Sequence, residues 1–290
     1  MMLSSAARYI RVFDAFEKYA IAAGVHEARQ ATAQLCVRFA TAATRCGYAP
    51  TGSTAAVRLA AVRDAFEGML GAGLISENPA LDIHVTREQS VVHTRPLTPE
   101  EAQRLLIAGR LFSSDTLRPA CVALALAGAT HVEVARTVVA DADLEAELVR
   151  LGCGTRFERT VDLDVVANAA LTARVNSLRR EWRRRKRSWE PESIPLAMHR
   201  PVSAYRADVV APTVSMNLSR AMKAAGVTRK GVRPRSCREY AANDVYARTG
   251  RVEDVAQRLG IVSLDAAHRL LDSEWQRQWG QLDNSRGLRP

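Results

Sequence analysis

The sequence has few cysteines, and it has no apolar stretch long enough to cross a membrane. Five cysteines occur in 290 residues, no two of them form a CxxC pair, and no Cys/His cluster has the spacing of a metal site. We therefore expect free thiols in a reducing cytosol, mostly buried, with no metal and no cofactor. The N-terminus also lacks the apolar region of a signal peptide, and no apolar run approaches the roughly 20 residues of a membrane span. These absences predict a cytoplasmic protein that has no membrane as a partner.

Acidic residues are outnumbered by basic ones, 31 to 41, which gives a formal net charge of +10. Together with the low aromatic content, this excess favours nucleic-acid phosphates over a membrane surface as a partner, although a merely basic protein has the same composition. Seven of the nine residues 179–187 are positively charged. DNA contact by Arg183, Arg184 and Arg187 is favoured there over a solvated helix end, and Trp182 is expected to be a packing anchor.

The first 84 residues have the apolar periodicity of a helical bundle. Helices are predicted over three ranges, which are 6–23, 28–46 and 53–70. In the third of them Arg58 and Arg63 lie on the side nearer to solvent. The predicted organisation is a helical DNA-binding domain at 1–84, a linker at 85–96 and a second domain at 97–290.

The second domain is predicted to combine helices with a small sheet. Two or three strand-like runs, separated by acidic and glycine turns, lie at 135–139, 147–152 and 156–163. A long helix follows from Asp164. Further on, 232–271 is predicted to form three short helices that are separated by Gly250 and Gly260, since glycine enters the left-handed C-cap conformation without a Cβ penalty.

Residues 232–271 also contain a characteristic order of residues. Pro234 and Arg238 precede an alanine-rich helix that ends in glycine, and a Val/Leu-periodic helix then ends in Leu259-Gly260. This order resembles the C-terminal half of the catalytic domain of tyrosine recombinases (phage integrases). In that family a proline, a His-x-x-Arg box, the two helices, a Leu-Gly-His end and a nucleophilic tyrosine follow one another.

Two earlier segments resemble the same family. Gly-Leu-Ile-Ser-Glu-Asn-Pro-Ala at 73–80 is similar to the end of the family's N-terminal domain, and Pro-Leu-Thr-Pro-Glu-Glu at 96–101 to the start of its catalytic domain. The resemblance covers about 9–271. It implies a mainly α (α+β) fold with an N-terminal helical core-binding (SAM-like) bundle and a recombinase catalytic-like domain that holds a small antiparallel sheet. It also implies a bacterial or phage-encoded, nucleoid-associated protein.

The family's catalytic positions carry other residue types in this sequence. The resemblance places these positions on Thr130, Cys153, Arg235, Arg238, Ile261 and Leu270. Only Arg238 keeps the family's residue type, and Leu270 stands where the family has its nucleophilic tyrosine. No tyrosine follows Tyr246, so no phenol is available near Leu270. Ordinary local roles are favoured over catalytic ones for His131, Cys153 and Tyr240.

The leading functional hypothesis is a catalytically inactive protein of this fold that binds double-stranded DNA, as a transcriptional regulator or as an accessory or architectural factor in recombination. The expected DNA contacts are Arg235, Arg238, Arg58, Arg63, Arg183, Arg184 and Arg187. An active integrase with atypical catalytic residues is the alternative, and a decayed mobile-element product without specific binding is a third reading. Other expected partners are an active recombinase and a second copy of the chain held by the tail at Trp275 and Trp279, whose indoles could equally pack within the chain.

Overall fold

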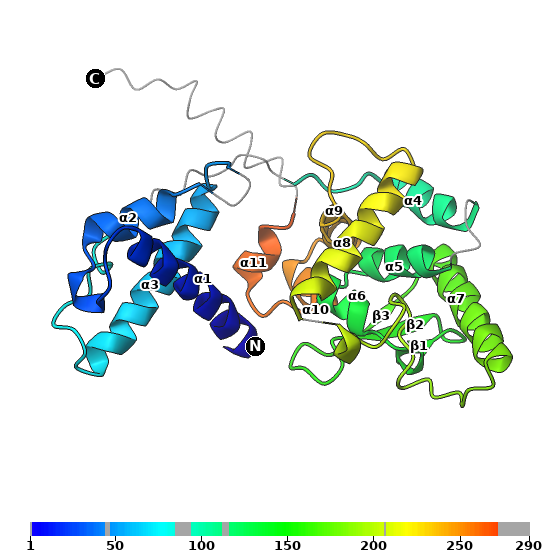
Figure 1. Cartoon of the computed structure of the whole chain (residues 1–290). Helices are drawn as coiled ribbons and strands as arrows, with labels where there is room; N and C mark the ends of the chain where they lie inside the picture. Colours follow the sequence, from blue (N-terminus) through cyan, green and yellow to red (C-terminus); the bar gives the residue numbers. More distant parts are fainter. Residues whose placement is uncertain (1, 44–46, 85–93, 112–115, 206, 272–290) are drawn as a thin grey trace, which may run out of the picture. The chain divides into compact units, whose positions relative to one another are not determined.

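The computed structural model describes residues 2–43, 47–84, 94–111, 116–205 and 207–271. The chain divides into two compact units, unit 1 at 1–93 and unit 2 at 94–290 (Figure 1). Most of the predicted linker at 85–96 lies outside the described residues, and so do Trp275 and Trp279.

Unit 1 is a bundle in which two helices pack against a third. Its elements are α1 (Met2–Ala22), a 3-10 turn (Ala28–Gln30), α2 (Ala33–Thr41) and α3 (Gly52–Gly71). The prediction of one helix over 28–46 was wrong. The Thr32 hydroxyl accepts a hydrogen bond from the Leu35 N–H and so begins α2 there, and the extended backbone of Ala42 ends it.

The core of unit 1 is built around phenylalanine side chains. Phe16 of α1 lies edge-on to Phe39 of α2 and to Phe66 of α3, with ring centroids 5.3 and 5.7 Å apart. All three side chains are buried. Aromatic pairs in this geometry contribute attraction beyond the apolar area that they remove from water. The ring of Phe16 therefore joins α1 to both α2 and α3.

Unit 2 surrounds one largely apolar helix, α5. Nine of its ten residues are buried, and Arg118 is the exception. The helices α4, α7, α8 and α9 all pack on it. The remaining bounds are α4 (Pro99–Leu111), α5 (Leu117–Leu126), α6 (His131–Arg136), α7 (Val165–Arg184) and α8 (Ala207–Ala224). Among the helices that the structure describes, none is both long enough and apolar enough to cross a membrane.

A three-stranded antiparallel sheet in the order β1-β2-β3 lies between α6 and α7 in the sequence. It consists of β1 (Ala142–Asp143), β2 (Leu148–Leu151) and β3 (Arg159–Asp162), with Val149 opposite Val161. The predicted second and third strands are confirmed, but the predicted strand at 135–139 was wrong. Its first residues, Ala135 and Arg136, are the end of α6, and after one isolated β-bridge between Val138 and Pro195 the chain enters a 3-10 helix at Val139–Asp141.

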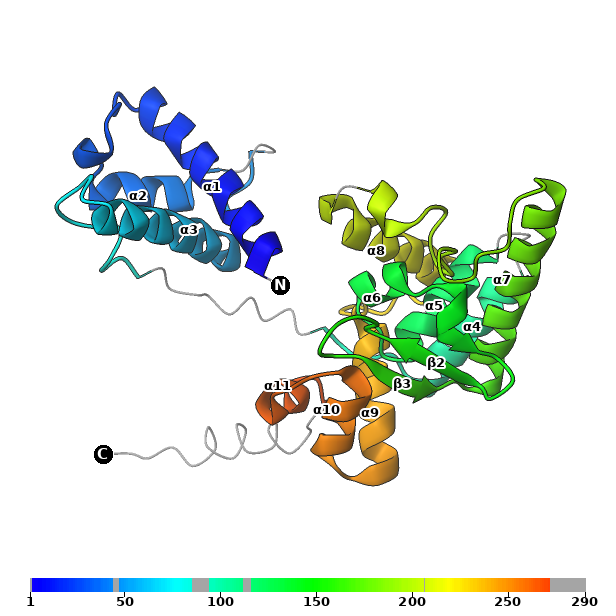
Figure 2. The ribbon, with the colours of Figure 1, turned by 90° about the horizontal axis from the view of Figure 1, so that it is seen from below.

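The last described part of unit 2 consists of α9 (Ser236–Thr249), α10 (Val252–Leu259) and α11 (Leu264–His268). Gly250 and Gly260 end the first two helices in the left-handed conformation, as predicted. These helices share a small apolar core of their own. Figure 2 shows α10 and α11 beside α9, on the opposite side of unit 2 from α7.

Four of the five cysteines lie in the described residues, and all four are free thiols. Cys36, Cys121 and Cys237 are buried, and burial raises the pKa of Cys36 to about 11 and that of Cys121 to about 12. The prediction of buried free thiols is confirmed for these three. Cys153 is exposed.

We expect Phe66→Ala to destabilise unit 1 by about 3 to 5 kcal/mol, because it removes the ring that contacts both Phe13 and Phe16 and leaves a cavity. Hydrogen exchange of the α3 amides in the full chain measures this local free energy of opening. Ile10→Ala is the control, since Ile10 is 61% exposed and its truncation leaves no cavity. Equal protection of α3 in both variants would place the stability of unit 1 elsewhere.

Candidate functional site

Five of the six sequence-predicted catalytic positions meet around one pocket of about 450 Å³ in unit 2. They are Thr130, Arg235, Arg238, Ile261 and Leu270. The start of α6, the start of α9, the α10–α11 connection and the end of α11 bring them together. Cys153 does not line the pocket.

Thr130 forms the N-terminal cap of α6. Its hydroxyl accepts a hydrogen bond from the Glu133 N–H at 3.2 Å, and the Glu133 carboxylate accepts one from the Thr130 N–H at 2.7 Å. This reciprocal pair is a capping box, which satisfies two backbone donors that the helix leaves free. Thr130 therefore positions Glu133 and places no charge in the pocket.

Glu133 and Arg159 form a buried ion pair that the sequence analysis missed. The Arg159 Nη1 lies 2.6 Å from Glu133 Oε1, and the two side chains are 7% and 13% exposed. Arg159 also donates to the backbone carbonyls of Gly128, Phe157 and Arg258. One side chain thus ties β3 to α6 and to the last turn of α10.

Burial alone would raise the pKa of Glu133, because a charged carboxylate loses its hydration there. The hydrogen bonds from Arg159 and Thr130 and the charge of Arg159 outweigh this effect, and the pKa of Glu133 lies below its usual value. Glu133 is therefore ionised at neutral pH.

Arg238 lies on the other side of the same carboxylate. Its Nη1 is 3.7 Å from Glu133 Oε2, and its Nη2 donates to the carbonyl of Leu259 at 2.7 Å. The side chain is only 17% exposed. Burial, together with the charges of Arg159 and Arg235, lowers the pKa of Arg238 to about 10 even though Glu133 favours its charged form. Arg238 is thus a buried cation that stays protonated at pH 7.

Arg235 is at the mouth of the pocket and is 64% exposed. It forms an ion pair of 3.2 Å with Glu239, one helical turn along α9. The Glu239 side chain is only 7% exposed, so the pair joins an exposed cation to a buried carboxylate. Unlike Arg238, Arg235 has most of its side chain accessible to a further partner.

Cys153 lies in the turn between β2 and β3, where Gly152 and Gly154 both have left-handed backbone. Its thiol donates to Asp141 Oδ1 at 3.1 Å. Partial burial and this hydrogen bond raise the pKa of Cys153 to about 11, so the thiol is protonated at neutral pH. A local turn role fits this geometry.

The two predicted DNA contacts of unit 1 have partners inside that unit. Arg58 donates to the carbonyls at the end of α2 and lies over the Phe39 ring, and Arg63 donates to the carbonyls of Ala80 and Ile83. Both side chains are half-buried, so the structure assigns each a fold-stabilising role that the sequence did not reveal. Their contact with DNA stays a prediction.

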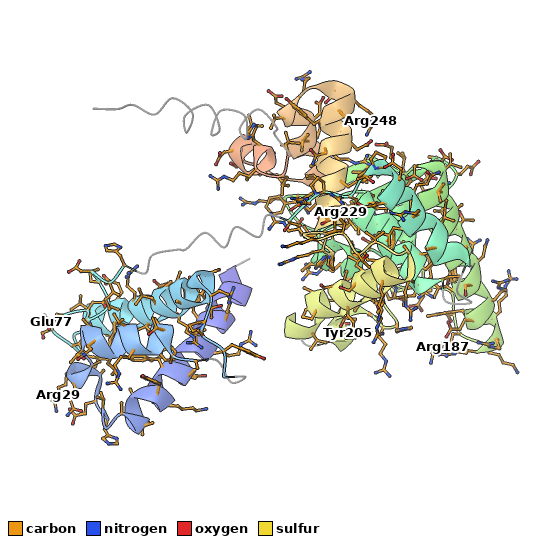
Figure 3. The ribbon with its side chains drawn as sticks, turned by 90° about the horizontal axis from the view of Figure 1, so that it is seen from above. Arg29, Glu77, Arg187, Tyr205, Arg229 and Arg248 are labelled. Atoms are coloured by element: carbon orange, nitrogen blue, oxygen red, sulfur yellow. The ribbon has the colours of Figure 1, made fainter. Side chains whose placement is uncertain are left out.

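The basic cluster Arg183, Arg184 and Arg187 is exposed at the end of α7, where cations are favourable to the helix dipole. Figure 3 shows Arg187 at this end and Arg248 near the end of α9, on different sides of unit 2. None of the cluster lines the pocket. Trp182 packs on the core and edge-on against Trp189, as a packing anchor should.

Metal ligands do not gather in the part of the chain that the structure describes, since no three His, Cys, Asp or Glu side chains there could hold an ion together. Among the described residues that line the pocket, Arg235 and Arg238 are the two arginines.

Known structures contain the same arrangement of elements. A lambda integrase fragment, crystallised as a dimer bound to a COC′ core site, is 17% identical and superposes with a TM-score of 0.64 over 92% of this chain and 87% of that chain. The XerH site-specific recombinase, bound to a palindromic difH substrate, is 15% identical with a TM-score of 0.64 over 96% and 78%. The Tn1549 transposon integrase, in complex with transposon right end DNA, is 12% identical with a TM-score of 0.62 over 94% and 91%.

This chain has the tyrosine-recombinase fold. The predicted fold class is confirmed, because the chain is mainly helical, has a small antiparallel sheet and matches these structures along most of its length. At these identities the likeness concerns the fold. No protein-family model matches the sequence, and no curated protein does so either.

We expect Glu133→Gln to lower the free energy of unfolding of unit 2 by about 3 to 5 kcal/mol at pH 7, because it leaves Arg159 and Arg238 buried without their carboxylate. Urea unfolding measures the difference, and Glu145→Gln is the control, since it removes the same charge from an exposed position. The pKa of Glu133 is lowered, so its contribution is present above the unfolded value of about 4.3 and is lost as the pH falls through the folded value. A difference between wild type and Glu133→Gln that stays constant down to acid pH would contradict this assignment.

Proposed function

We propose that this chain binds duplex DNA without cutting it, as a transcriptional regulator or as an accessory or architectural factor in recombination. Three observations support DNA as the partner. The fold is that of tyrosine recombinases, three structures similar to it contain DNA or a DNA substrate, and the chain has a net charge of +10. Phosphate contacts by exposed arginines supply most of the affinity of such complexes.

The observation that carries the absence of cleavage is the composition of the pocket. Strand transfer through a phosphotyrosine needs a nucleophile, a general acid and preorganised positive charge around the phosphate. Ile261 and Leu270 supply none of these, and no Tyr or Lys is among the described residues that line the pocket. No tyrosine follows Tyr246 in the whole sequence.

The neighbouring residues support the same proposal. Burial lowers the pKa of His131, the one histidine in the described pocket wall, so its imidazole is neutral at pH 7 and adds no positive charge. Burial raises the pKa of Tyr240, which disfavours its phenolate, and Tyr240 does not line the pocket. An active integrase with atypical residues therefore has less support than a DNA-binding protein.

Self-association and association with an active recombinase belong to the same proposal. Lambda integrase has been crystallised as a dimer and as a tetramer on DNA. The predicted contact of the tail through Trp275 and Trp279 lies outside the described residues.

A footprint of genomic fragments bound by the purified full-length chain tests the proposal. Protected sites in promoters would indicate a regulator, and sites at element ends would indicate a recombination factor. Absence of any preferred site would overturn specific binding and favour a decayed protein that keeps only its fold.

We expect Arg235→Ala to weaken binding to a mapped site and to lower the slope of log K against log salt by about 1, because one phosphate contact is lost. Fluorescence anisotropy over a salt series measures both quantities. Arg248→Ala is the matched control. It is similarly exposed and also pairs with a carboxylate one turn away, although Asp244 is exposed where Glu239 is buried, and it does not line the pocket. If both variants lost the same affinity for DNA, the DNA would contact α9 in general and not the pocket in particular.

We expect Leu270→Tyr to form no covalent adduct on a nicked suicide substrate that carries the mapped site. The introduced phenol still lacks an arginine at 130 and a histidine at 261, and each such group contributes on the order of 10² to 10³ in rate. Leu270→Phe, which has the same ring without the hydroxyl, is the control. An adduct with the wild-type chain would establish an active enzyme, and an adduct with Leu270→Tyr alone would show that the remaining cations suffice for cleavage.

A further inference from the structure

The basic residues at the end of α7 lie on a different side of unit 2 from the pocket. The helix packs on α4 and α5, and at 1.5 Å per residue its 20 residues extend about 30 Å. Figure 2 shows α7 on the opposite side of unit 2 from α10 and α11, and Figure 3 shows Arg187 at its end. None of the described residues 165–192 lines the pocket. The end of α7 and Arg235 therefore belong to separate surfaces.

Most of the cations at this end are not neutralised. Residues 179–192 include seven basic and three acidic residues. Among the described residues, one ion pair forms within this segment, between Arg185 and Glu181 at 2.8 Å. Five exposed cations have no ion-pair partner in the described part of the chain. We call them the α7 basic end, and they are Arg180, Arg183, Arg184, Lys186 and Arg187.

The fold does not explain these cations. A helix dipole favours cations in the last turn, but Lys186 and Arg187 follow the last residue of α7. Arg180 and Arg184 are four positions apart on the helix, a spacing at which like charges repel each other. Lys186 also has left-handed backbone, with a φ of 51°, the conformation in which glycine ends α9 and α10. The chain therefore keeps a cation where the backbone favours glycine.

The turn that carries these cations is held on the core of unit 2. The Arg187 N–H donates to the Trp182 carbonyl at 3.1 Å, and the Lys186 N–H donates to the Arg183 carbonyl at 3.1 Å. Trp189 packs edge-on against Trp182 with ring centroids 6.3 Å apart, and both rings pack on the core. The backbone of the α7 basic end is therefore fixed before a partner arrives, which lowers the entropic cost of binding.

We propose that the α7 basic end binds a second DNA duplex, so that one chain bridges two duplex segments. Four of its five cations are arginines, whose planar guanidinium groups match phosphate oxygens with two parallel hydrogen bonds. Contacts with the phosphate backbone need no particular base sequence. The inference rests on the proposed function, because it assigns the first duplex to Arg235 and the pocket. A chain with two such surfaces acts as an architectural factor that holds a DNA loop.

Uptake of a second duplex by the full-length chain tests the inference. The chain is saturated with an unlabelled duplex that carries the mapped site, and a fluorescent duplex of unrelated sequence is then added. We expect anisotropy to show one further duplex per chain, with a dissociation constant on the order of 10⁻⁶ M at low salt. A chain that fills the mapped site but takes up no second duplex would refute this inference alone. A chain that binds neither duplex would refute the proposed function as well.

A chain that combines Arg183→Gln, Arg184→Gln and Arg187→Gln identifies the surface. We expect it to take up the second duplex at least about tenfold more weakly, with the slope of log K against log salt lowered by about 3, because three phosphate contacts are lost. If this chain lost affinity for the mapped site and for the second duplex in equal proportion, one duplex would contact both surfaces and the inference would be wrong.

The control matched in charge changes three exposed arginines on the side of α9, α10 and α11, and it combines Arg248→Gln, Arg251→Gln and Arg269→Gln. We expect this control to take up the second duplex as the wild-type chain does. Equal thermal midpoints of the three DNA-free chains show that the fold is intact. Equal losses of uptake in the two triple variants would mean that net charge alone drives the binding, against the inference.

Lys186→Gly separates binding from a structural role. Glycine removes the cation and suits the left-handed backbone, so we expect an unchanged or higher thermal midpoint together with weaker uptake and a salt slope lowered by about 1. Unchanged uptake in this variant would contradict the assignment of Lys186. Tighter uptake of single-stranded RNA than of the duplex, or self-association of the DNA-free chain that is lost with Arg183, Arg184 and Arg187, would assign the surface to another partner and overturn the inference.

Discussion

The buried contact between Glu133 and Arg159 holds the candidate site together. Removing either group leaves an uncompensated charge in a place where water cannot solvate it, which costs several kcal/mol. Arg159 also donates hydrogen bonds to the carbonyls of Gly128 and Arg258. The start of α6 and the end of α10 therefore meet β3 at this guanidinium. Arg238 and the carbonyl of Leu259 extend this network to α9. The positions of Thr130, Arg235 and Ile261 around the pocket follow from it.

The same network explains two glycines. A Cβ on Gly128 would lie 2.7 Å from the Leu259 side chain, and one on Gly260 would lie 2.7 Å from Arg159 Nη1. Both residues also have positive φ, which disfavours any side chain. Gly128 therefore leaves room for the Leu259 side chain, and Gly260 leaves room for the Arg159 guanidinium. At Gly260 both the left-handed cap of α10 and the nearby Arg159 side chain favour glycine.

The glycine caps of α9 and α10 could be predicted from the residues next to them. Contacts between residues far apart in the sequence could not. Gly250 and Gly260 end α9 and α10 as predicted because capping depends on adjacent backbone. The strand predicted at 135–139 was wrong because α6 takes its first two residues and the β-branched residues after them have one bridge partner, Pro195, which is 57 positions from Val138 in the sequence. Arg159 was missed although Arg159 and the buried Val161 are two positions apart in β3, which places them on one face. The alternation of faces along β3 places Arg159 on the buried face. The sequence around it does not reveal its partner Glu133, which lies 26 positions earlier.

These contacts separate residues that serve the fold from residues that serve a ligand. Glu133, Arg159 and Arg238 have partners that explain them by stability alone, since each satisfies a carbonyl or a charge that the packing of α6, α9 and α10 buries. A protein that does not cleave DNA can therefore keep Arg238 for stability, and the presence of Arg238 is not in itself a sign of cleavage. Arg235 differs, because its side chain is mostly exposed although the Glu239 carboxylate that it pairs with is buried. Arg238 donates to the Leu259 carbonyl and lies beside Glu133, so the packing of the helices accounts for it, whereas Arg235 keeps most of its charged side chain exposed at the pocket and accessible to an anionic partner.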